Sequence, residues 1–188
     1  MKLDPKKTAV LTLDMQDGLL GFAPGATVAF PKAAEVVEAA RKAGILLIHV
    51  GIGFEPGYPE ISPKNKRFGM VKEKGVFVKG SDTAKINSAL YKPGDTIIYK
   101  HRVGAFAGNS LYMILQSQGI ENLVFFGIST SGIVLSTIRA AFDLDFQPFV
   151  IKDACFDPDE EVHRVLTEKV FAHQGTVLTA KEFVADYV

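Results

Sequence analysis

The chain has 188 residues, and its 21 Lys and Arg are balanced by 21 Asp and Glu. This length fits one domain, residues 1–188, with a substantial core, and the balanced charge excludes the basic surface typical of nucleic-acid-binding proteins. No apolar stretch approaches the roughly 18 residues of a membrane span, and residues 1–7 lack the apolar segment of a signal peptide. The single cysteine, Cys155, suits a reducing compartment. We therefore expect a cytoplasmic protein that binds neither nucleic acid nor membrane.

A carboxylate closes the first predicted strand. Residues 8–15 form an apolar run in which Asp14 is the one charged side chain. Because burying an unpaired carboxylate costs several kcal/mol, a charge in this position favours a functional role over packing. The alternative role is to cap the turn that follows. Gln16 could reach the same pocket through its amide.

The next segments predict a helix, a second strand and a long surface loop. Residues 31–43, opened by a proline, predict the helix, and residues 45–50 predict the buried strand. Residues 51–80 are rich in Gly and Pro without clear periodicity, which predicts a surface excursion that borders a pocket or meets another subunit. Aromatic candidates for a pocket wall are Phe22, Phe54, Tyr58 and Phe68; packing within the loops is the alternative.

A cation closes the third predicted strand. After a short helix over residues 82–90, the strand at residues 96–100 ends in Lys100. Lys100 could instead extend into solvent. Arg102 would suit a substrate carboxylate, with solvent exposure as the alternative. Phe106, in the loop that follows, is a further candidate for substrate binding.

The densest signal lies in residues 121–141. Residues 123–126 predict a strand buried on both faces, and Gly-Ile-Ser-Thr-Ser-Gly at 127–132 turns the chain into a helix. Such a turn places free backbone N–H groups at the carboxyl edge of the sheet, where open α/β sheets bind ligands. Candidate binding residues of this turn are Ser129, Thr130 and Gly132. An ordinary strand-to-helix loop is the alternative reading.

Two further strands complete the predicted sheet. They lie at residues 148–153 and 176–179, and the helix between them begins with Asp157 as its expected cap. Strands alternate with helices along the whole chain, which predicts a parallel sheet with right-handed crossovers and helices on both faces.

Three of these features together resemble the isochorismatase-like hydrolases, also called cysteine hydrolases, over about residues 8–179. They are Asp14 after the first strand, Lys100 followed by Phe-x-Gly-x-x-Leu from Phe106, and the Gly-Ile-Ser-Thr turn. The resemblance implies a three-layer α/β/α sandwich with a six-stranded parallel sheet in the order 3-2-1-4-5-6. It also implies a cis peptide between Ile128 and Ser129, and a single crevice bordered by Asp14, Lys100 and residues 127–133.

The chain departs from this family at one decisive position. Family amidases carry a cysteine nucleophile six residues after the glycine that opens the turn, and the residue here is Ile133. A hydrocarbon side chain cannot attack a carbonyl, so thiolate chemistry is unavailable there. The resemblance therefore implies a catalytic set of Asp14, Lys100 and the altered position Ile133.

Three functions stay open. The first is a hydrolase without a nucleophile, as in the family's isochorismatases, with Asp14 as acid and base and Lys100 as its electrostatic partner. The second uses Cys155 as nucleophile, although the neighbouring Asp153 and Asp157 disfavour a thiolate. The third is a catalytically silent protein that binds a metabolite or serves as a subunit of an assembly.

The expected partners follow from the same resemblance. Nicotinamidases of the family bind a metal through Asp and His residues after the second strand, whereas residues 51–60 here contain no histidine. We therefore expect no metal and no cofactor. The partners expected are a small-molecule substrate and further copies of the chain in a dimer or larger homo-oligomer.

Overall fold

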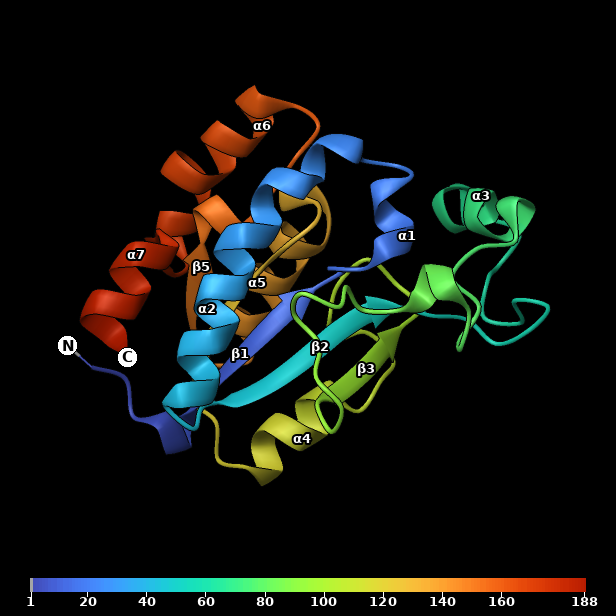
Figure 1. The fold of residues 1–188 in the computed structure, drawn as a ribbon. Coiled ribbons are helices and arrows are strands. Elements are labelled where there is room, and N and C mark those ends of the chain that lie inside the picture. The colour runs from blue at the N-terminus through green and yellow to red at the C-terminus, as the bar shows by residue number, and fades with distance from the viewer. Residues whose placement is uncertain (1) are drawn as a thin grey trace.

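Six parallel strands form the centre of the molecule (Figure 1). The structure is a computed structural model and describes residues 2–188. The sheet has the order β3-β2-β1-β4-β5-β6, and every neighbouring pair is parallel. The strands are β1 (Thr8–Leu13), β2 (Leu46–Ile52), β3 (Thr96–Lys100), β4 (Asn122–Gly127), β5 (Gln147–Ile151) and β6 (Thr176–Leu178). The predicted strand order and direction are confirmed.

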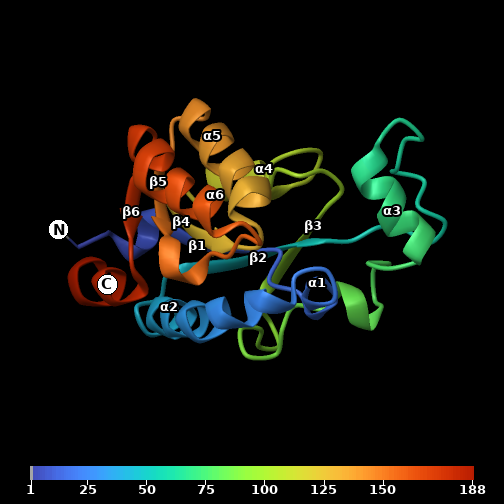
Figure 2. The ribbon, with the colours of Figure 1, turned by 90° about the horizontal axis from the view of Figure 1, so that it is seen from above.

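Helices cover both faces of this sheet, as the view from above shows (Figure 2). They are α1 (Asp17–Leu20), α2 (Phe30–Lys42), α3 (Lys66–Lys74), α4 (Leu111–Ser117), α5 (Leu135–Asp143), α6 (Glu160–Val165) and α7 (Ala180–Glu182). Helices α2 and α7 lie on one face, and α4, α5 and α6 lie on the other. Within residues 2–188, no helix combines the length and the apolar character needed to cross a membrane.

The main core lies between the sheet and the two helix layers. All six residues of β1 and five of the six residues of β4 are buried, because these central strands are covered on both faces. That burial explains why both segments are nearly continuous apolar runs. It also explains why a charged residue at the end of such a strand indicates a partner or a functional role.

Residues 51–80 are not the irregular loop that their glycine and proline content predicted. They contain α3, which begins after Asn65, whose side chain accepts a hydrogen bond from the Phe68 N–H at 3.1 Å. The helix ends at Gly75, whose φ of 64° suits a residue without a side chain. Figure 1 shows α3 apart from the main layers, beyond the carboxyl ends of β2 and β3. A second apolar cluster lies at its base and includes Ile52, Phe54, Tyr58, Ile61, Phe68, Val71 and Phe77.

Two other local predictions are wrong. The helix expected over residues 82–90 is a single 3-10 turn at Asp82–Ala84. Helix α6 is capped by Asp159, whose side chain accepts from the N–H groups of Glu161 and Val162, and not by Asp157. Asp157 instead accepts a hydrogen bond from the backbone of Ser131, which belongs to the turn after β4. Because the Asp157 carboxylate is hydrogen-bonded to a turn that is distant in the sequence, it does not cap α6. Rules based on neighbouring residues cannot predict such a contact.

The homo-oligomer stays a prediction. Met70 on α3 and Met113 on α4 are 55% and 70% exposed, which supplies apolar surface to two different faces. We expect light scattering to give a mass of at least twice the 20.4 kDa of one chain. A mass equal to one chain would contradict the prediction.

Candidate active site

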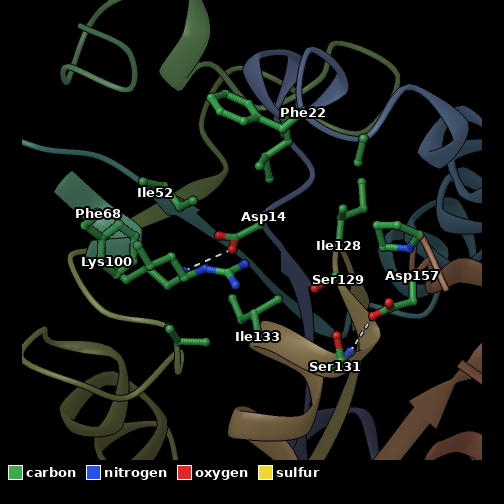
Figure 3. A pocket seen from close by; sticks show the side chains of 15 residues that line it. Asp14, Phe22, Ile52, Phe68, Lys100, Ile128, Ser129, Ser131, Ile133 and Asp157 are labelled. Carbon is green, nitrogen blue, oxygen red and sulfur yellow. Dashed lines mark hydrogen bonds and ion pairs between the residues drawn. The ribbon is translucent and has the colours of Figure 1, made fainter. Parts of the chain in front are cut away.

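The strand ends bring the predicted catalytic residues to one edge of the sheet. Leu13 at the end of β1 pairs with Gly127 at the end of β4, and Ile52 of β2 pairs with Lys100 of β3. Asp14, Lys100 and Ile133 therefore border the same cavity, of about 280 Å³. Figure 3 shows these three side chains facing a common space, with Phe22 above it.

Asp14 and Lys100 form a buried ion pair. The Lys100 Nζ lies 3.0 Å from Asp14 Oδ2, and the two side chains are 1% and 6% exposed, respectively. Lys100 also donates a hydrogen bond to the backbone oxygen of Arg102 at 3.0 Å. The other carboxylate oxygen, Asp14 Oδ1, is buried and has no hydrogen-bond partner within residues 2–188. Asp14 therefore has one oxygen held by a cation and one left for a ligand.

Burial alters the proton affinity of both members of this pair. Desolvation raises the pKa of Asp14 to about 6, against the opposing effects of Lys100 and Arg67. Desolvation also lowers the pKa of Lys100, which Asp14 in turn opposes. Asp14 therefore keeps its proton to a higher pH than an exposed aspartate does, which favours a role as general acid.

The turn after β4 has the predicted backbone and forms one wall of the cavity. The Ile128–Ser129 peptide is cis, and residues Thr130–Val134 form a π-helical turn that leads into α5. The Ser131 N–H donates to Asp157 Oδ2 at 2.7 Å, which ties the turn to the segment before α6. Ile133 is 1% exposed, and its side chain lines the cavity beside Asp14 and Lys100.

Other expected binding residues lie in different places. Phe22, Phe68 and Ser129 line the cavity. Gln16 lies outside its lining, because its buried amide donates to the backbone oxygens of Ile52 and Ala84 and accepts from the Ile52 N–H. This amide joins two backbone segments, and both of its N–H donors are already used.

Four further candidates are held by protein contacts outside the cavity lining. Phe54 is fully buried in the cluster at the base of α3, and Phe106 stacks on Phe146 with ring centroids 6.0 Å apart. Thr130 Oγ1 hydrogen-bonds to His163 Nδ1 at 2.8 Å. The Arg102 guanidinium donates to the backbone oxygens of His101 and Glu60.

Gly132 contributes space to the turn. A Cβ atom at this position would lie 2.8 Å from Ser129 Oγ, which is too close for any larger residue without a shift of the serine. The same point lies 3.7 Å from a guanidinium nitrogen of Arg67. The absence of a side chain at Gly132 therefore leaves room for the Arg67 guanidinium beside the turn.

Arg67 is the cavity residue that the sequence did not indicate. It lies on α3, lines the cavity, and forms no ion pair with any residue of the described range 2–188. Its region carries no clear helical periodicity, so nothing predicted that an arginine there would reach the site. The one available signal is local: Asn65 as a cap and Gly75 as a stop delimit a short helix that contains it.

Cys155 does not line this cavity. Its thiol is buried and donates to the Ile151 backbone oxygen at 3.3 Å, and burial raises its pKa to about 12. We therefore expect iodoacetamide at pH 8 to leave the native protein unlabelled and to add one label after unfolding in urea, as measured by intact mass. Rapid labelling of the folded protein would contradict this assignment of Cys155 as a structural thiol.

Comparisons with known proteins identify the family of the chain. The family model described as the isochorismatase domain matches residues 8–182. A ureidoacrylate amidohydrolase of Azorhizobium caulinodans is 32% identical over 202 residues, which covers 95% of this chain and 89% of the relative. A cysteine hydrolase from Pseudomonas syringae superposes with a TM-score of 0.88 at 18% identity, and covers 98% of this chain and 93% of its own. An N-carbamoylsarcosine amidase from Thermoplasma acidophilum gives a TM-score of 0.78 at 22% identity, over 94% and 98% of the two chains. The chain therefore belongs to the isochorismatase family of hydrolases.

Proposed function

We propose that the protein hydrolyses a small anionic molecule, with Asp14 as acid and base, Lys100 as its electrostatic partner, and no protein nucleophile at position 133. One observation carries the proposal. Asp14 is buried against Lys100 at 3.0 Å, while its Oδ1 is unpartnered within residues 2–188 at the edge of a cavity. A carboxyl group in this environment can hold a proton near neutrality and pass it to a bound molecule.

An enol ether of pyruvate suits this acid. Protonated Asp14 gives its proton to the terminal CH₂ carbon, whose C=C electron pair forms the new C–H bond. The resulting positive charge is shared between C2 and the ether oxygen. Water adds to C2 and returns one proton to the Asp14 carboxylate, and the hemiketal breaks down to pyruvate and the alcohol.

The neighbouring residues have separate roles in this scheme. Lys100 stabilises the Asp14 carboxylate while the proton is on the substrate, because an opposite charge at 3.0 Å favours the ionised form. Ile133 forms an apolar wall of the cavity and takes no part in bond making.

The test is product release from a panel that contains 2-methoxyacrylate, which is the methyl enol ether of pyruvate, and small amides. Pyruvate and ammonia are followed together. Pyruvate release from the ether supports the proposal. Ammonia release from an amide without pyruvate from any ether would contradict the ether chemistry. It would identify cleavage of a C–N bond, as the name ureidoacrylate amidohydrolase describes for the Azorhizobium relative.

A catalytically silent, metabolite-binding protein is the second candidate. The observation that favours it is the hydrocarbon of Ile133 in the cavity wall, at the position where the resemblance places a nucleophile. The same Asp14, Lys100 and Arg67 would then hold a ligand without reacting. Saturable ligand binding without release of either product would support this candidate over the hydrolase.

The pH dependence of turnover follows from the proton on Asp14. Its pKa is raised to about 6, so the acid form is fully present well below that pH and is lost as the pH rises through it. We expect kcat/KM for 2-methoxyacrylate to fall about tenfold per pH unit above pH 7. The measurement is a profile from pH 5 to 8.5, with the Asp14→Asn protein as the blank at each pH. A flat profile would contradict the acid role.

A further inference from the structure

A second cavity adjoins the first. It has a volume of about 260 Å³ and shares five lining residues with the cavity at Asp14: Leu19, Phe22, Ile52, Arg67 and Phe68. The residues that belong to it alone are Met70, Val71 and Phe77. It therefore lies between α1 and α3, where Figures 1 and 2 both show the two helices beyond the end of the sheet. The two cavities form one site with two compartments.

The compartments differ in chemistry. Asp14, Lys100, Ser129, Ser131 and Asp157 supply polar groups to the first. Apart from Arg67, every residue that lines the second is apolar. Two of them, Phe22 and Met70, are 42% and 55% exposed in the described chain. Large apolar side chains held exposed at the mouth of a cavity are typical of a surface that an apolar ligand covers.

Arg67 stands where the two compartments meet. It lines both, and a guanidinium nitrogen lies 3.7 Å from the point where a Cβ of Gly132 would be. Its charge also acts on Asp14 and Lys100. Since it forms no ion pair with residues 2–188, a carboxylate at the inner end of a ligand would complete its coordination.

The rim of the second compartment is held in place by aromatic contacts. The Phe22 ring lies 6.0 Å from the Phe77 ring, centroid to centroid, and Lys74 Nζ lies 4.3 Å from the Phe22 centroid. These contacts link the segment after α1 to α3 and its C-terminal side. The walls of the apolar compartment are therefore already in contact with one another in the structure without a ligand.

We infer that the natural substrate is amphipathic, with a carboxylate-bearing reactive end at Asp14, Lys100 and Arg67 and an alkyl or aryl substituent in the compartment lined by Met70, Val71 and Phe77. An apolar cavity of ~150 Å³ already holds a benzene molecule. The second compartment, at about 260 Å³, has room for a phenyl ring or a short alkyl chain. Only the assignment of the reactive end rests on the proposed function.

The test measures binding, so that it does not depend on turnover. Butanoate and hexanoate share a carboxylate and differ by two methylenes, and their dissociation constants are measured by NMR titration of the folded protein at pH 7. Each methylene buried in an apolar site strengthens binding about fourfold, so hexanoate is expected to bind about 16-fold more tightly than butanoate. Equal affinities for the two acids would overturn the inference.

Matched variants locate the effect. Met70→Gln places an amide in the second compartment and is expected to reduce the hexanoate-to-butanoate ratio at least threefold. Met113→Gln makes the same change at an exposed helical methionine on α4 and is expected to leave the ratio unchanged. Arg67→Gln is expected to weaken the binding of both acids, because it removes a cationic partner of the carboxylate that the two acids share. An equal loss in Met70→Gln and Met113→Gln would contradict the assigned compartment.

The outcomes separate this inference from the proposed function. Chain-length-dependent binding without hydrolysis of any enol ether would contradict the proposed activity and support the apolar compartment. The opposite outcome is hydrolysis of 2-methoxyacrylate with no gain in affinity or kcat/KM as the alkoxy chain is lengthened to that of 2-pentoxyacrylate. It would support the proposed activity and overturn the apolar compartment.

Discussion

Replacement of Asp14 by Asn is expected to lower kcat/KM for 2-methoxyacrylate by about 10²–10⁴, the range that a positioned acid supplies. Asn matches Asp in size, and it tolerates the left-handed φ of 56° that the backbone adopts at this position. Its amide oxygen can still accept from Lys100. The loss of kcat/KM would therefore come from the missing proton and not from a change in the shape of the cavity. It is measured by pyruvate release from 2-methoxyacrylate for both proteins under the same conditions.

Asp17→Asn is the matched control for that experiment. Asp17 begins α1, accepts a hydrogen bond from Asn87 Nδ2, and lies outside the lining of the cavity at Asp14. We expect this variant to retain activity within about twofold, since it changes one exposed hydrogen bond and no group of the cavity at Asp14. A folded Asp14→Asn protein with the activity of the control would contradict the role assigned to Asp14.

Lys100→Met is expected to reduce the free energy of unfolding by about 3–5 kcal/mol at pH 7.5, because it leaves the carboxylate of Asp14 buried without its cation. The penalty should shrink at pH 5, where Asp14 takes up a proton. Urea denaturation at the two pH values measures both effects.

The double variant Asp14→Asn, Lys100→Met separates pairing from packing. With both charges removed, no uncompensated ion remains in the interior, so its loss of stability should be smaller than the sum of the two single losses. The double variant should nevertheless be as inactive as Asp14→Asn. Additive losses of stability would show that the two side chains do not act as a pair.

Much of the fold was predictable because its physical signals are local and repeated. The central strands are buried on both faces, so β1 and β4 had to be continuous apolar runs, and the alternation of strands with helices specified the parallel sheet. Asp14 and Lys100 could be found for the same reason. A charge that closes a fully apolar strand is costly unless a partner compensates it, and each proved to be the other's partner.

The direction of single side chains was less predictable. Gln16 lies two residues after Asp14 in the sequence, but its amide is consumed by the backbone of Ile52 and Ala84. At Arg102 the backbone oxygen, and not the guanidinium, contacts the buried ion pair, because it accepts a hydrogen bond from Lys100. Sequence spacing specifies which residues come near an edge, and tertiary hydrogen bonds then decide which atoms face the cavity.

Arg67 lay beyond sequence reasoning for a different reason. It belongs to a short helix whose place depends on a separate apolar cluster, and the distance along the chain between Arg67 and Asp14 or Lys100 gives no hint that they meet. A nine-residue helix bracketed by Asn65 and Gly75 is visible in the sequence only when both caps are sought.

The central claim is that burial keeps a transferable proton on Asp14 near neutral pH. It is tested most directly by ¹³C NMR titration of the side-chain carboxyl groups in protein labelled at Asp, with the Asp14→Asn protein identifying the signal. The account predicts a midpoint for Asp14 near pH 6. A midpoint below pH 4, as for an ordinary exposed aspartate, would leave no acid for the reaction at neutral pH and would contradict the mechanism.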